Sequence, residues 1–485
     1  MNKSIAAVVT FLVCASFALA KPVSERAALG KAKVFLKQNL ASRQEMKLSV
    51  AYKGRKVTDG NPRLYVCNMG NDQGFVILSG DDRTVPVLAY SDTGSFDAEN
   101  IPANVQWWMD YYEEAVAQVA DMQLSNNAPS ARPTDVISPL ITTKWDQSEP
   151  YNLMCPKVNG STPPTGCVAT AMAQLMYYHK WPVDSTEAID AYTTETHKVK
   201  VDKLQPTTFE WNDMLRSYGR NATQKQKDAV AKLMRYCGQL VQMDYTPSSS
   251  GAQTFYLGWV LPRAFKYPNT IHNVFRDGYS IEQWDSLLIN ELKNKRPVLY
   301  TGYTMAFEGH AFLCDGYDGK GYYHINWGWS GAADGHYRIS VLDANANGIG
   351  GSSTSMRFSL MQSAIIGVKT SGEDEYRVPE KVVAANSRPS LKAGRTYIRT
   401  GNDTDFKGVT VNFTLTNLGE REENFNVGLA LCDSEGTIIK TLKTTSRMLW
   451  LGYADEVEMT VNFGKDSKRA ITPLCPYSER GVLEA

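Results

Sequence analysis

The stretch GCVATAMAQLMYYHKW, from Gly166 to Trp181, predicts the element around which the central domain folds. Five of its residues recur at the spacing of a single helix face, namely Val168, Met172, Leu175, Met176 and His179. Prolines flank the stretch at positions 163, 164 and 182. Because proline cannot continue a helix backwards and ends a helix that reaches it, we expect a helix that begins near Cys167.

Cys167 therefore falls in the first turn of the predicted helix. Free backbone N–H groups and the positive end of the helix dipole favour the thiolate there, and the thiolate is the nucleophilic form of cysteine. The alternative is a small buried apolar residue, as free cysteines often are. The position at the helix start, together with the partners described below, favours a nucleophile.

The chain of 485 residues begins like an exported protein, with Lys3, an apolar run from Ile5 to Leu19 and a small-residue site that ends at Ala20. The run is too short for a convincing membrane span, and no later stretch reaches that length. Seven further cysteines at wide spacings predict neither a disulfide framework nor a zinc site. Lys+Arg and Asp+Glu number 51 each, so the charge gives no reason to expect nucleic acid or an acidic membrane as a partner.

Residues 21–123 are predicted to form an α+β unit. It contains helices over 24–40 and 103–122, and strands near 46–52, 64–69, 74–79 and 85–91. It has no histidine and one cysteine, Cys67, so it offers no acid–base or metal chemistry. Because it lies between an export signal and a nucleophile domain, we interpret it as an inhibitory prodomain, with a folding or docking domain as the alternative.

Residues 124–142 are polar and contain Pro129, Pro133 and Pro139. This composition predicts a solvated linker that proteases reach easily. If the prodomain is removed, the cut belongs here or shortly after.

The chain has six histidines, and elimination narrows the search for a general base. His179 follows Cys167 on the same helix, about 18 Å along the axis, which is too far to take its proton. His197 and His272 lie in loop-like sequence without other reactive side chains nearby. The remaining three fall close together: His310, His324 and His336.

The segment from 308 to 329 has two apolar runs around a centre rich in Asp and Gly, which predicts a β-hairpin. With a turn near residues 318 and 319, His310 lies opposite Trp327, and Asn326 is adjacent. Asn326 could orient the imidazole by accepting from a ring N–H, and Trp327 by packing against the ring and excluding water. His310 is the predicted base, and the other two histidines are expected to be structural.

Four motifs together resemble the streptopain family of papain-like cysteine proteases: residues 166–171, 244–250, 309–312 and 323–329. The resemblance runs from the export signal to about Thr370 and is strongest between Thr143 and Arg338. It implies a papain-like catalytic fold, secretion and an N-terminal prodomain that is removed on activation. His310 follows Cys167 by 143 residues, within the interval of about 130 to 150 residues between these groups in papain-like enzymes.

The resemblance makes Cys167 the nucleophile and His310 the general base that later protonates the leaving amine. Gln147 matches the family's oxyanion-hole glutamine, whose neutral amide donates to an oxyanion without bringing a charge into the site. Trp327 matches the tryptophan that stands where papain has its orienting asparagine, and Asn326 is the second candidate for that role. The implied substrate-binding residues are Ser248, Ser249 and Ser250 in a serine-rich loop, and Gly309 beside the base.

One departure from the family pattern is Glu308, which stands where a glycine is expected. Its carboxylate either alters side-chain preference at the rim of the site or points into water. The Gly/Asn/Ser-rich segment from Asn345 to Ser353 resembles the mobile loop near the family's active site.

After about residue 370 the pattern changes to alternating apolar and polar residues with Gly and Asn turns, which predicts an immunoglobulin-like β-sandwich over residues 371–485. The region has no histidine, so hydrolytic chemistry is not expected there. It either binds a surface or matrix partner or acts as a stabilising or export-related appendage.

The sequence thus predicts an α+β chain with an export signal (1–20), a prodomain (21–123), a linker (124–142), a papain-like domain (143–370) and a β-sandwich (371–485). We expect a secreted cysteine endopeptidase, made as a zymogen, that cleaves polypeptides through a thioester without a cofactor or metal. Its own prodomain is the expected intramolecular inhibitor. The alternatives are a degenerate domain that acts as an adhesin, and an enzyme that uses the same dyad on amides other than proteins.

Overall fold

The computed structural model describes residues 22–40, 46–56, 61–120, 124–126, 133–276, 279, 281–303, 309–339, 346–348 and 362–376. It also describes the strands between 382 and 484 with residues 419, 422 and 450. The predicted export signal, Glu308 and most of the loop 345–353 lie outside the described residues. Within these ranges no helix has the length and apolar character needed to cross a membrane.

The N-terminal unit has the predicted elements: α1 (Glu25–Asn39), β1 (Leu48–Lys53), β2 (Leu64–Met69), β3 (Phe75–Ser79), β4 (Val87–Ser91) and α2 (Ala103–Ala120). Helix α1 begins after Ser24, whose hydroxyl accepts a hydrogen bond from the backbone N–H of Ala27. The buried face of α1, which includes Phe35 and Leu36, packs on one face of the β1–β4 meander.

Ten strands follow one another in the main sheet, in the order β1-β2-β3-β4-β15-β14-β13-β12-β17-β11. The strands that come from the central domain are β11 (His272–Phe275), β12 (Val298–Tyr303), β13 (Gly309–Asp318), β14 (Tyr323–Asn326), β15 (Gly335–Tyr337) and β17 (Ser363–Ile366). The two units join where β4 pairs antiparallel with β15, with Tyr90 opposite His336 and Ala89 opposite Tyr337. The N-terminal unit therefore covers an edge of the central sheet whose backbone groups would otherwise lack strand partners.

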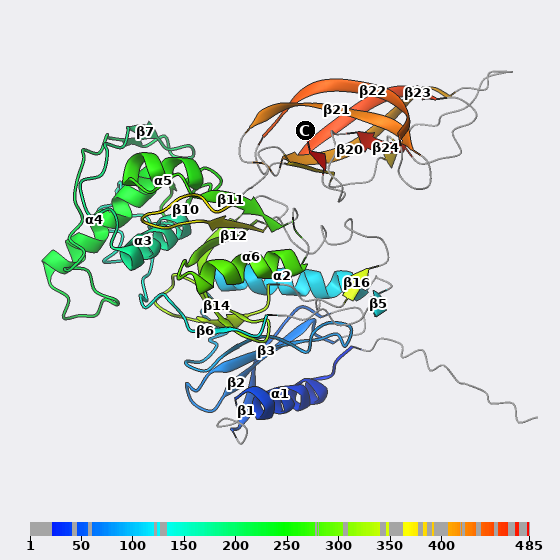
Figure 1. Cartoon of the computed structure of the whole chain (residues 1–485). Helices are drawn as coiled ribbons and strands as arrows, with labels where there is room; N and C mark the ends of the chain where they lie inside the picture. Colours follow the sequence, from blue (N-terminus) through cyan, green and yellow to red (C-terminus); the bar gives the residue numbers. More distant parts are fainter. Residues whose placement is uncertain are drawn as a thin grey trace, which may run out of the picture.

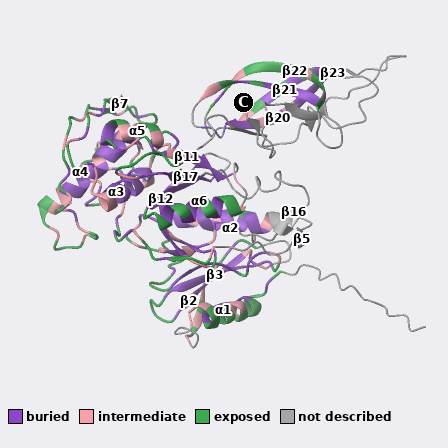
Figure 2. Ribbon diagram, in the orientation of Figure 1, coloured by how far each residue is buried: buried purple, intermediate pink, exposed green. Residues whose placement is uncertain are grey.

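Helix α2 lies against the central domain rather than on its own meander alone (Figure 1). Its buried aromatic residues include Trp107, Trp108, Tyr111 and Tyr112, and Figure 2 shows the buried stripe along the helix. The ring of Trp108 meets the ring of Phe312 edge-on at 5.5 Å. Helix α2 and the strands of the central domain thus share one hydrophobic core.

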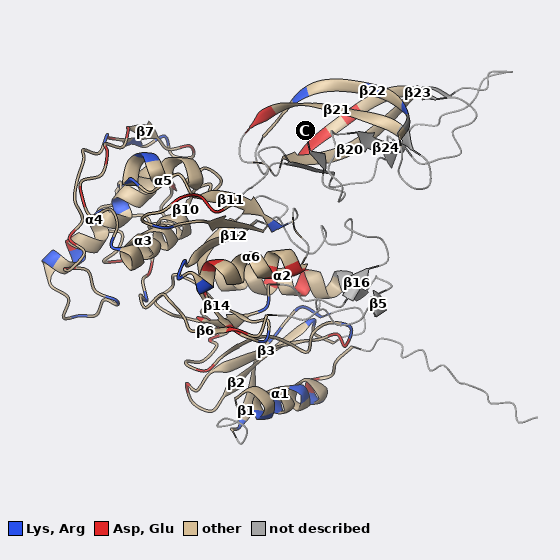
Figure 3. Cartoon of the chain, viewed as in Figure 1, with Lys and Arg blue, Asp and Glu red and all other residues tan. Residues whose placement is uncertain are grey.

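The opposite face of the central strands packs against the helical half of the domain, formed by α3 (Cys167–His179), α4 (Gln224–Leu240) and α5 (Leu257–Phe265). A capping box of Thr223 and Gln226 begins α4. Short strand pairs connect these helices: β7 (Tyr192–Thr193) with β8 (Lys200–Val201), and β9 (Asp244–Tyr245) with β10 (Ser250–Gly251). Helix α6 (Ile281–Lys293) packs in the same core as α2. In Figure 3, α3 carries no Lys, Arg, Asp or Glu, whereas α6 carries both acidic and basic residues.

The β13–β14 hairpin is present, but its register differs from the prediction. Leu313 pairs with Asn326 and Tyr317 with Tyr323, with a bulge between Cys314 and Gly316. The turn takes residues 319–322 because the Asp318 carboxylate accepts hydrogen bonds from the backbone N–H groups of Lys320 and Tyr322. His310 is consequently not opposite Trp327 and lies farther along β13, beyond the part that pairs with β14.

Part of the predicted linker is bound to the central domain. Strand β6 (Val136–Ile137) pairs with β13, and the backbone N–H of Ile141 donates to Asp315 Oδ2 (2.7 Å). Strand β5 (Leu124–Asn126) pairs with β16 (Ala346–Gly348). From Pro133 onward the predicted linker is therefore held by a strand pairing and an aspartate, although Thr134, Asp135, Val136, Ser138 and Pro139 are exposed to solvent as predicted.

Contacts of the central domain continue past the predicted boundary at residue 370. Asp374 Oδ2 lies 2.8 Å from His272 Nε2, and Glu375 forms an ion pair with Arg296 (3.3 Å). The tail up to Tyr376 is thus fastened to β11 and to the end of α6.

The C-terminal region consists of two antiparallel sheets with a common apolar core (Figure 1). One sheet contains β18 (Val382–Ala385), β19 (Ser390–Leu391), β20 (Phe406–Asn417), β23 (Ala454–Phe463) and β25 (Leu483–Glu484), and the other contains β21 (Glu423–Cys432), β22 (Ile438–Leu449) and β24 (Ile471–Leu474). The predicted alternation is confirmed, since Val411, Phe413 and Val427 are buried in that core. Residues 471–474 form a strand, although the sequence there shows no periodicity.

Candidate active site

Cys167 is the first residue of α3, and the chain turns into the helix at Gly166. Gly166 has φ +86°, and a Cβ there would lie 2.6 Å from Met243 Sδ and 2.9 Å from the Ser250 carbonyl oxygen. Only glycine combines this backbone conformation with this close approach. The local sequence therefore places the thiol at the helix N-terminus, as predicted.

The sulfur of Cys167 lies beside β13. The backbone N–H of Ala311 donates to Sγ at 3.4 Å. Burial raises the pKa of the Cys167 thiol, and the N–H groups of Ala311, Val168 and Cys167 itself only partly offset that effect. The thiol is therefore protonated at neutral pH in this arrangement.

His310 is the residue immediately before Ala311, on β13 opposite Gly302 of β12. Burial lowers the pKa of its imidazole to about 4, so the ring is neutral at physiological pH. Among the described residues, no hydrogen bond joins this ring to Cys167. The structure thus brings the two predicted dyad residues to the same place without completing a thiolate–imidazolium pair.

Helix α2 covers this place. The ring of Trp107 lies edge-on to the His310 ring at 6.3 Å, and a Cβ on Gly302 would lie 2.0 Å from the Trp107 indole. Asn104 Nδ2 donates to the carbonyl oxygens of Ala311 (3.3 Å) and Trp327 (3.0 Å). Helix α2 is therefore hydrogen-bonded, through Asn104, to the backbone of β13 next to His310 and to the backbone that follows β14.

Gln147 is held next to the start of α3. Its N–H donates to Asp146 Oδ1 (2.6 Å), and its carbonyl accepts from the N–H of Thr165 (2.9 Å), two residues before Cys167. Asp146 Oδ2 accepts from the hydroxyl of Ser330 (2.7 Å). Burial raises the pKa of Asp146, but hydrogen bonds, first that from Ser330, outweigh it and leave the pKa below its usual value. A charged Asp146 thus fixes the backbone that carries the oxyanion-hole candidate.

Trp327 follows the end of β14 and is fully buried. Its indole N–H donates to the Ala333 carbonyl (3.1 Å), and its backbone N–H donates to Asp334 Oδ1 (2.9 Å). Its ring lies 4.7 Å from the ring of Phe312 and 5.9 Å from that of Trp108 of α2. Among the described residues, no ring contact joins Trp327 to His310.

Asn326 is also buried, and its amide bonds elsewhere. Its Oδ1 accepts from Gln174 Nε2 (3.0 Å) and from the N–H of Gly328 (3.1 Å), and its Nδ2 donates to the Thr143 carbonyl (2.9 Å). No hydrogen bond from Asn326 to His310 occurs among the described residues. Asn326 therefore supports the turn around Trp327 in this arrangement.

The predicted substrate-binding residues lie at two sides of the nucleophile. Ser248 and Ser249 are exposed, and Ser250 donates through its hydroxyl to the Pro164 carbonyl (2.7 Å). The carbonyl of Ser250 also approaches Gly166. Gly309 begins β13 on the histidine side, opposite Tyr303.

Several residues at the site were not predicted from the sequence. The order Asp-Gln-Ser at 146–148 is a signal that could have revealed the turn, because aspartate often accepts from N–H groups one or two residues ahead. Asn104, Trp107 and Gln174 give no such signal. They read as ordinary helix residues, and only the tertiary fold brings them to the site.

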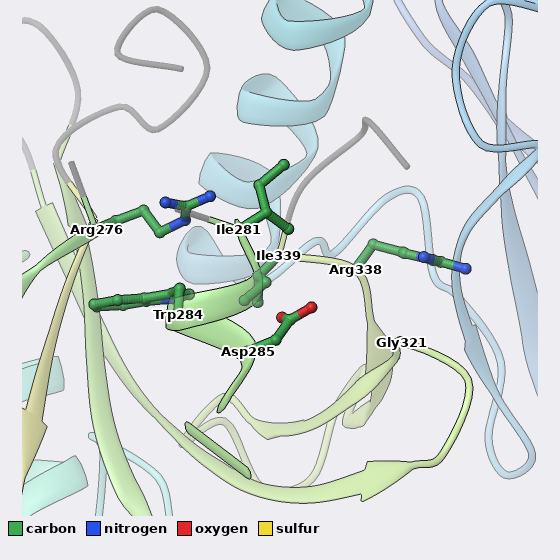
Figure 4. Close-up of a pocket in the computed structure, with 7 residues that line it drawn as sticks. All are labelled: Arg276, Ile281, Trp284, Asp285, Gly321, Arg338 and Ile339. Atoms are coloured by element: carbon green, nitrogen blue, oxygen red, sulfur yellow. The ribbon is translucent and has the colours of Figure 1, made fainter. Parts of the chain in front are cut away.

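No cluster of three His, Cys, Asp or Glu side chains within the described ranges could hold a metal ion. A pocket lies away from the site, between the start of α6 and the ends of β11 and β15 (Figure 4). The residues that line this pocket are Arg276, Ile281, Trp284, Asp285, Gly321, Arg338 and Ile339. None of them is a predicted site residue.

Two family models match parts of this chain. A family described as Spi protease inhibitor matches residues 20–116, and the Peptidase C10 family matches residues 145–337. Streptopain of Streptococcus pyogenes is 32% identical over 393 residues, which cover 74% of this chain and 97% of that protein. The thiol protease/hemagglutinin PrtT of Porphyromonas gingivalis is 29% identical over 394 residues, covering 77% of this chain and 45% of that protein.

Among solved structures, a fragment of prointerpain A from Prevotella intermedia superposes with a TM-score of 0.55 at 27% identity, covering 67% of this chain and 100% of the fragment. The fold of the N-terminal and central units is thus that of a precursor of this kind. Because streptopain matches over nearly its whole length at this identity, the chain belongs to the peptidase C10 family of cysteine proteases.

Proposed function

We propose that this cysteine protease is exported as an inactive precursor, that Cys167 and His310 form its catalytic dyad, and that residues 21–123 inhibit it until they are removed. One observation carries the proposal. The N–H of Ala311 donates to Cys167 Sγ, which sets the nucleophile against the strand that bears His310. The match of residues 20–116 to a protease inhibitor family supports the role of the N-terminal unit.

In the active form, His310 takes the proton from Cys167, and the thiolate attacks the carbonyl carbon of a peptide bond. The resulting oxyanion receives hydrogen bonds from the backbone N–H of Cys167 and from the side-chain amide of Gln147. His310 then protonates the leaving amine, the C–N bond breaks, and a thioester remains. Water, deprotonated by His310, attacks the thioester and releases the carboxylic acid and the thiol.

With α2 docked, this first proton transfer is unfavourable. Burial raises the pKa of Cys167 and lowers that of His310 to about 4, so the proton stays on sulfur at neutral pH. Trp107 also occupies space beside the imidazole. Removal of α2 uncovers the histidine, and the helix dipole and the imidazole can then stabilise the thiolate.

Polypeptides are the proposed substrates. An extended chain would pass between the Ser250 side and Gly309, since Ser248 and Ser249 are exposed and Gly309 has no side chain. The arrangement argues against the adhesin alternative, because a binding domain has no need for a helix that packs beside His310 on the strand next to a cysteine.

Hydrolysis of fluorogenic peptides by the processed protein tests the proposal. The linker is cut with an added protease, and wild type is compared with Cys167→Ala, His310→Ala and the control Cys237→Ala, which alters a fully buried cysteine on α4. We expect the first two variants to lose about 10³-fold or more of kcat/KM and the control to keep it. Activity that survives Cys167→Ala, or a wild type that cleaves no peptide, would contradict the proposal.

A further inference from the structure

Three buried polar residues form a closed ring of hydrogen bonds beneath the site. Gln174 Nε2 donates to Asn326 Oδ1 (3.0 Å), Asn326 Nδ2 donates to the Thr143 carbonyl (2.9 Å), and Thr143 Oγ1 donates to Gln174 Oε1 (2.6 Å). Each of the three is 3% exposed or less. A buried amide is costly unless it is paired, so such a ring has one well-defined geometry.

The ring lies on the same side of α3 as the nucleophile. Gln174 is seven residues beyond Cys167, which is two helical turns along one face. Gly328 packs on this face, where a Cβ would lie 3.1 Å from Thr170 Cγ2 and 3.8 Å from Gln174 Nε2. Gly328 has φ +73°, and its N–H donates to Asn326 Oδ1 (3.1 Å).

Both neighbours of Trp327 are therefore fastened to the nucleophile helix. Asn326 is bonded to Gln174, and Gly328 is bonded to Asn326 and packed on α3. The carbonyl of Trp327, in contrast, accepts from Asn104 of the prodomain. That bond is lost when the prodomain leaves, whereas every atom of the ring belongs to the catalytic domain.

We propose that Gln174 is a positioning residue for the protease. It acts through Asn326 on the backbone around Trp327, whose ring packs at 4.7 Å on Phe312 of β13, and so sets the strand that carries His310 relative to Cys167. The proposal rests on the proposed function and deepens it. It also gives Asn326 a role other than accepting from the imidazole, since its oxygen already accepts from Gln174 and Gly328.

The chain offers a matched control in Gln239 on α4. It is 1% exposed, like Gln174, and its Nε2 donates to the carbonyls of Asp190 (2.8 Å) and Asp202 (2.9 Å). None of these residues touches the site. Replacing either glutamine with methionine removes buried hydrogen bonds while keeping a similar side-chain volume, so both variants should lose stability. Only Gln174→Met should also lose catalytic activity.

The experiment uses the full chain after processing and measures Tm, kcat, KM and the pH profile of kcat/KM on a peptide substrate. For Gln174→Met we expect kcat to fall at least tenfold with KM within twofold. The acid limb of the profile should shift to higher pH, because a misplaced imidazole stabilises the thiolate less. Gln239→Met should lower Tm similarly and leave kcat and the profile unchanged. Adding Asn326→Leu to Gln174→Met should cost little more than the larger single effect, since the two residues act in one chain of bonds.

Thr143→Val provides a second reading if Gln174→Met does not fold. It removes only the hydroxyl bond to Gln174 and keeps the Thr143 carbonyl as an acceptor, and we expect kcat to fall at least threefold with KM unchanged. Equal kcat in Gln174→Met and Gln239→Met, or wild-type kcat in Thr143→Val, would overturn the proposal. A wild type that neither cleaves peptide nor reacts at Cys167 would instead overturn the proposed function, so the two failures are distinguishable.

Discussion

A single glycine determines how the nucleophile enters its helix. Gly166 has a backbone conformation that side chains rarely adopt, and the Ser250 carbonyl and Met243 leave no room for a Cβ. The flanking prolines predicted where the helix begins, but they carry no information about these neighbours, which come from β10 and from the residue before β9.

Gly166→Ala should therefore destabilise the protein more than a matched glycine variant does. Gly160 also has a positive φ, +81°, but a Cβ there meets nothing within 4 Å. We expect Gly160→Ala to lower the free energy of unfolding by about 1 to 2 kcal/mol through backbone strain alone. Gly166→Ala should lose about 1 to 3 kcal/mol more from overpacking, with a lower kcat/KM, because Cys167 shifts with the helix start. Urea unfolding and peptide hydrolysis measure both effects, and equal losses in the two variants would refute the steric argument.

At the scale of elements, hydrophobic periodicity predicted which residues are buried, but it did not predict which other elements they pack against. The predicted helix over residues 103–122 is present as α2, and its aromatic residues pack in a core that includes residues of the central-domain strands. The β13–β14 hairpin was expected as well, but Asp318 extends its turn to four residues and moves His310 away from Trp327. Contacts between segments that are distant in the sequence depend on the tertiary fold. They cannot be predicted from the local pattern of apolar and polar residues.

The ring of Trp107 is expected to contribute directly to inhibition because it lies beside His310 and over Gly302. Trp107→Ala should raise the rate at which a small alkylating agent modifies Cys167 in the uncut precursor by about tenfold or more. Trp259→Ala, at a tryptophan that is 59% exposed on α5, is the control and should leave the rate unchanged. Intact-mass measurement separates uncut from processed protein. Equal rates in the two variants would show that this ring does not shield the site.

The β4–β15 junction should make prodomain docking sensitive to pH. The ring of His336 stacks on the ring of Tyr90, with 5.0 Å between their centroids. The ring of His324 lies edge-on to that of His336 at 5.2 Å. Burial, and then the nearby charge of His324, lower the pKa of His336 to about 4, although Asp318 and Asp92 oppose the shift. His324 itself is paired with Asp315 at 2.6 Å, which keeps its pKa raised against its burial.

The docked state thus binds fewer protons than a separated one in which His336 regains its ordinary pKa of about 6.5. Docking should be strongest above that pH and weaken as pH falls towards 4. In Cys167→Ala protein with a cut linker, we expect the prodomain to dissociate at least tenfold faster at pH 5 than at pH 7.5. His336→Phe keeps a stacking ring that does not titrate, so it should flatten the pH dependence of the dissociation rate. If that pH dependence is unchanged in the variant, groups other than His336 cause it.

At the scale of the whole molecule, the N-terminal and central units form one continuous sheet, and the C-terminal strands have a core of their own, although the Tyr256 hydroxyl donates to Glu422 Oε1 (2.7 Å). The N-terminal and central units share strands and a core, whereas the buried core residues of the C-terminal strands form a cluster of their own. The alternation after about residue 370 predicts strands, and the described residues from 382 to 484 do form strands. The fastening of residues 371–376 to the central domain was not predictable, because it depends on individual side-chain contacts: Asp374 with His272, Glu375 with Arg296 and Tyr376 with Glu291.

A chain that ends after Tyr376 should consequently keep peptidase activity. We expect kcat/KM of the processed enzyme to stay within twofold of wild type, since the described site contains no residue beyond 376. A chain that ends after Ile366 is the contrast, because it lacks the ion pairs of Asp374 and Glu375, and its Tm should be lower. Loss of activity in the longer truncation would assign the C-terminal region a part in the catalytic site.

Mass spectrometry of the full-length protein tests the central claim most directly. Wild type and Cys167→Ala are each incubated under reducing conditions with a thiol-directed epoxide inhibitor of proteases and then measured. We predict that the wild type loses its N-terminal unit through a cut before Pro133 and then carries one inhibitor on Cys167, while the variant stays whole and unlabelled. A wild type that stays unlabelled at Cys167 even after an added protease has cut the linker would contradict the assignment of this chain as a precursor with a Cys167/His310 dyad.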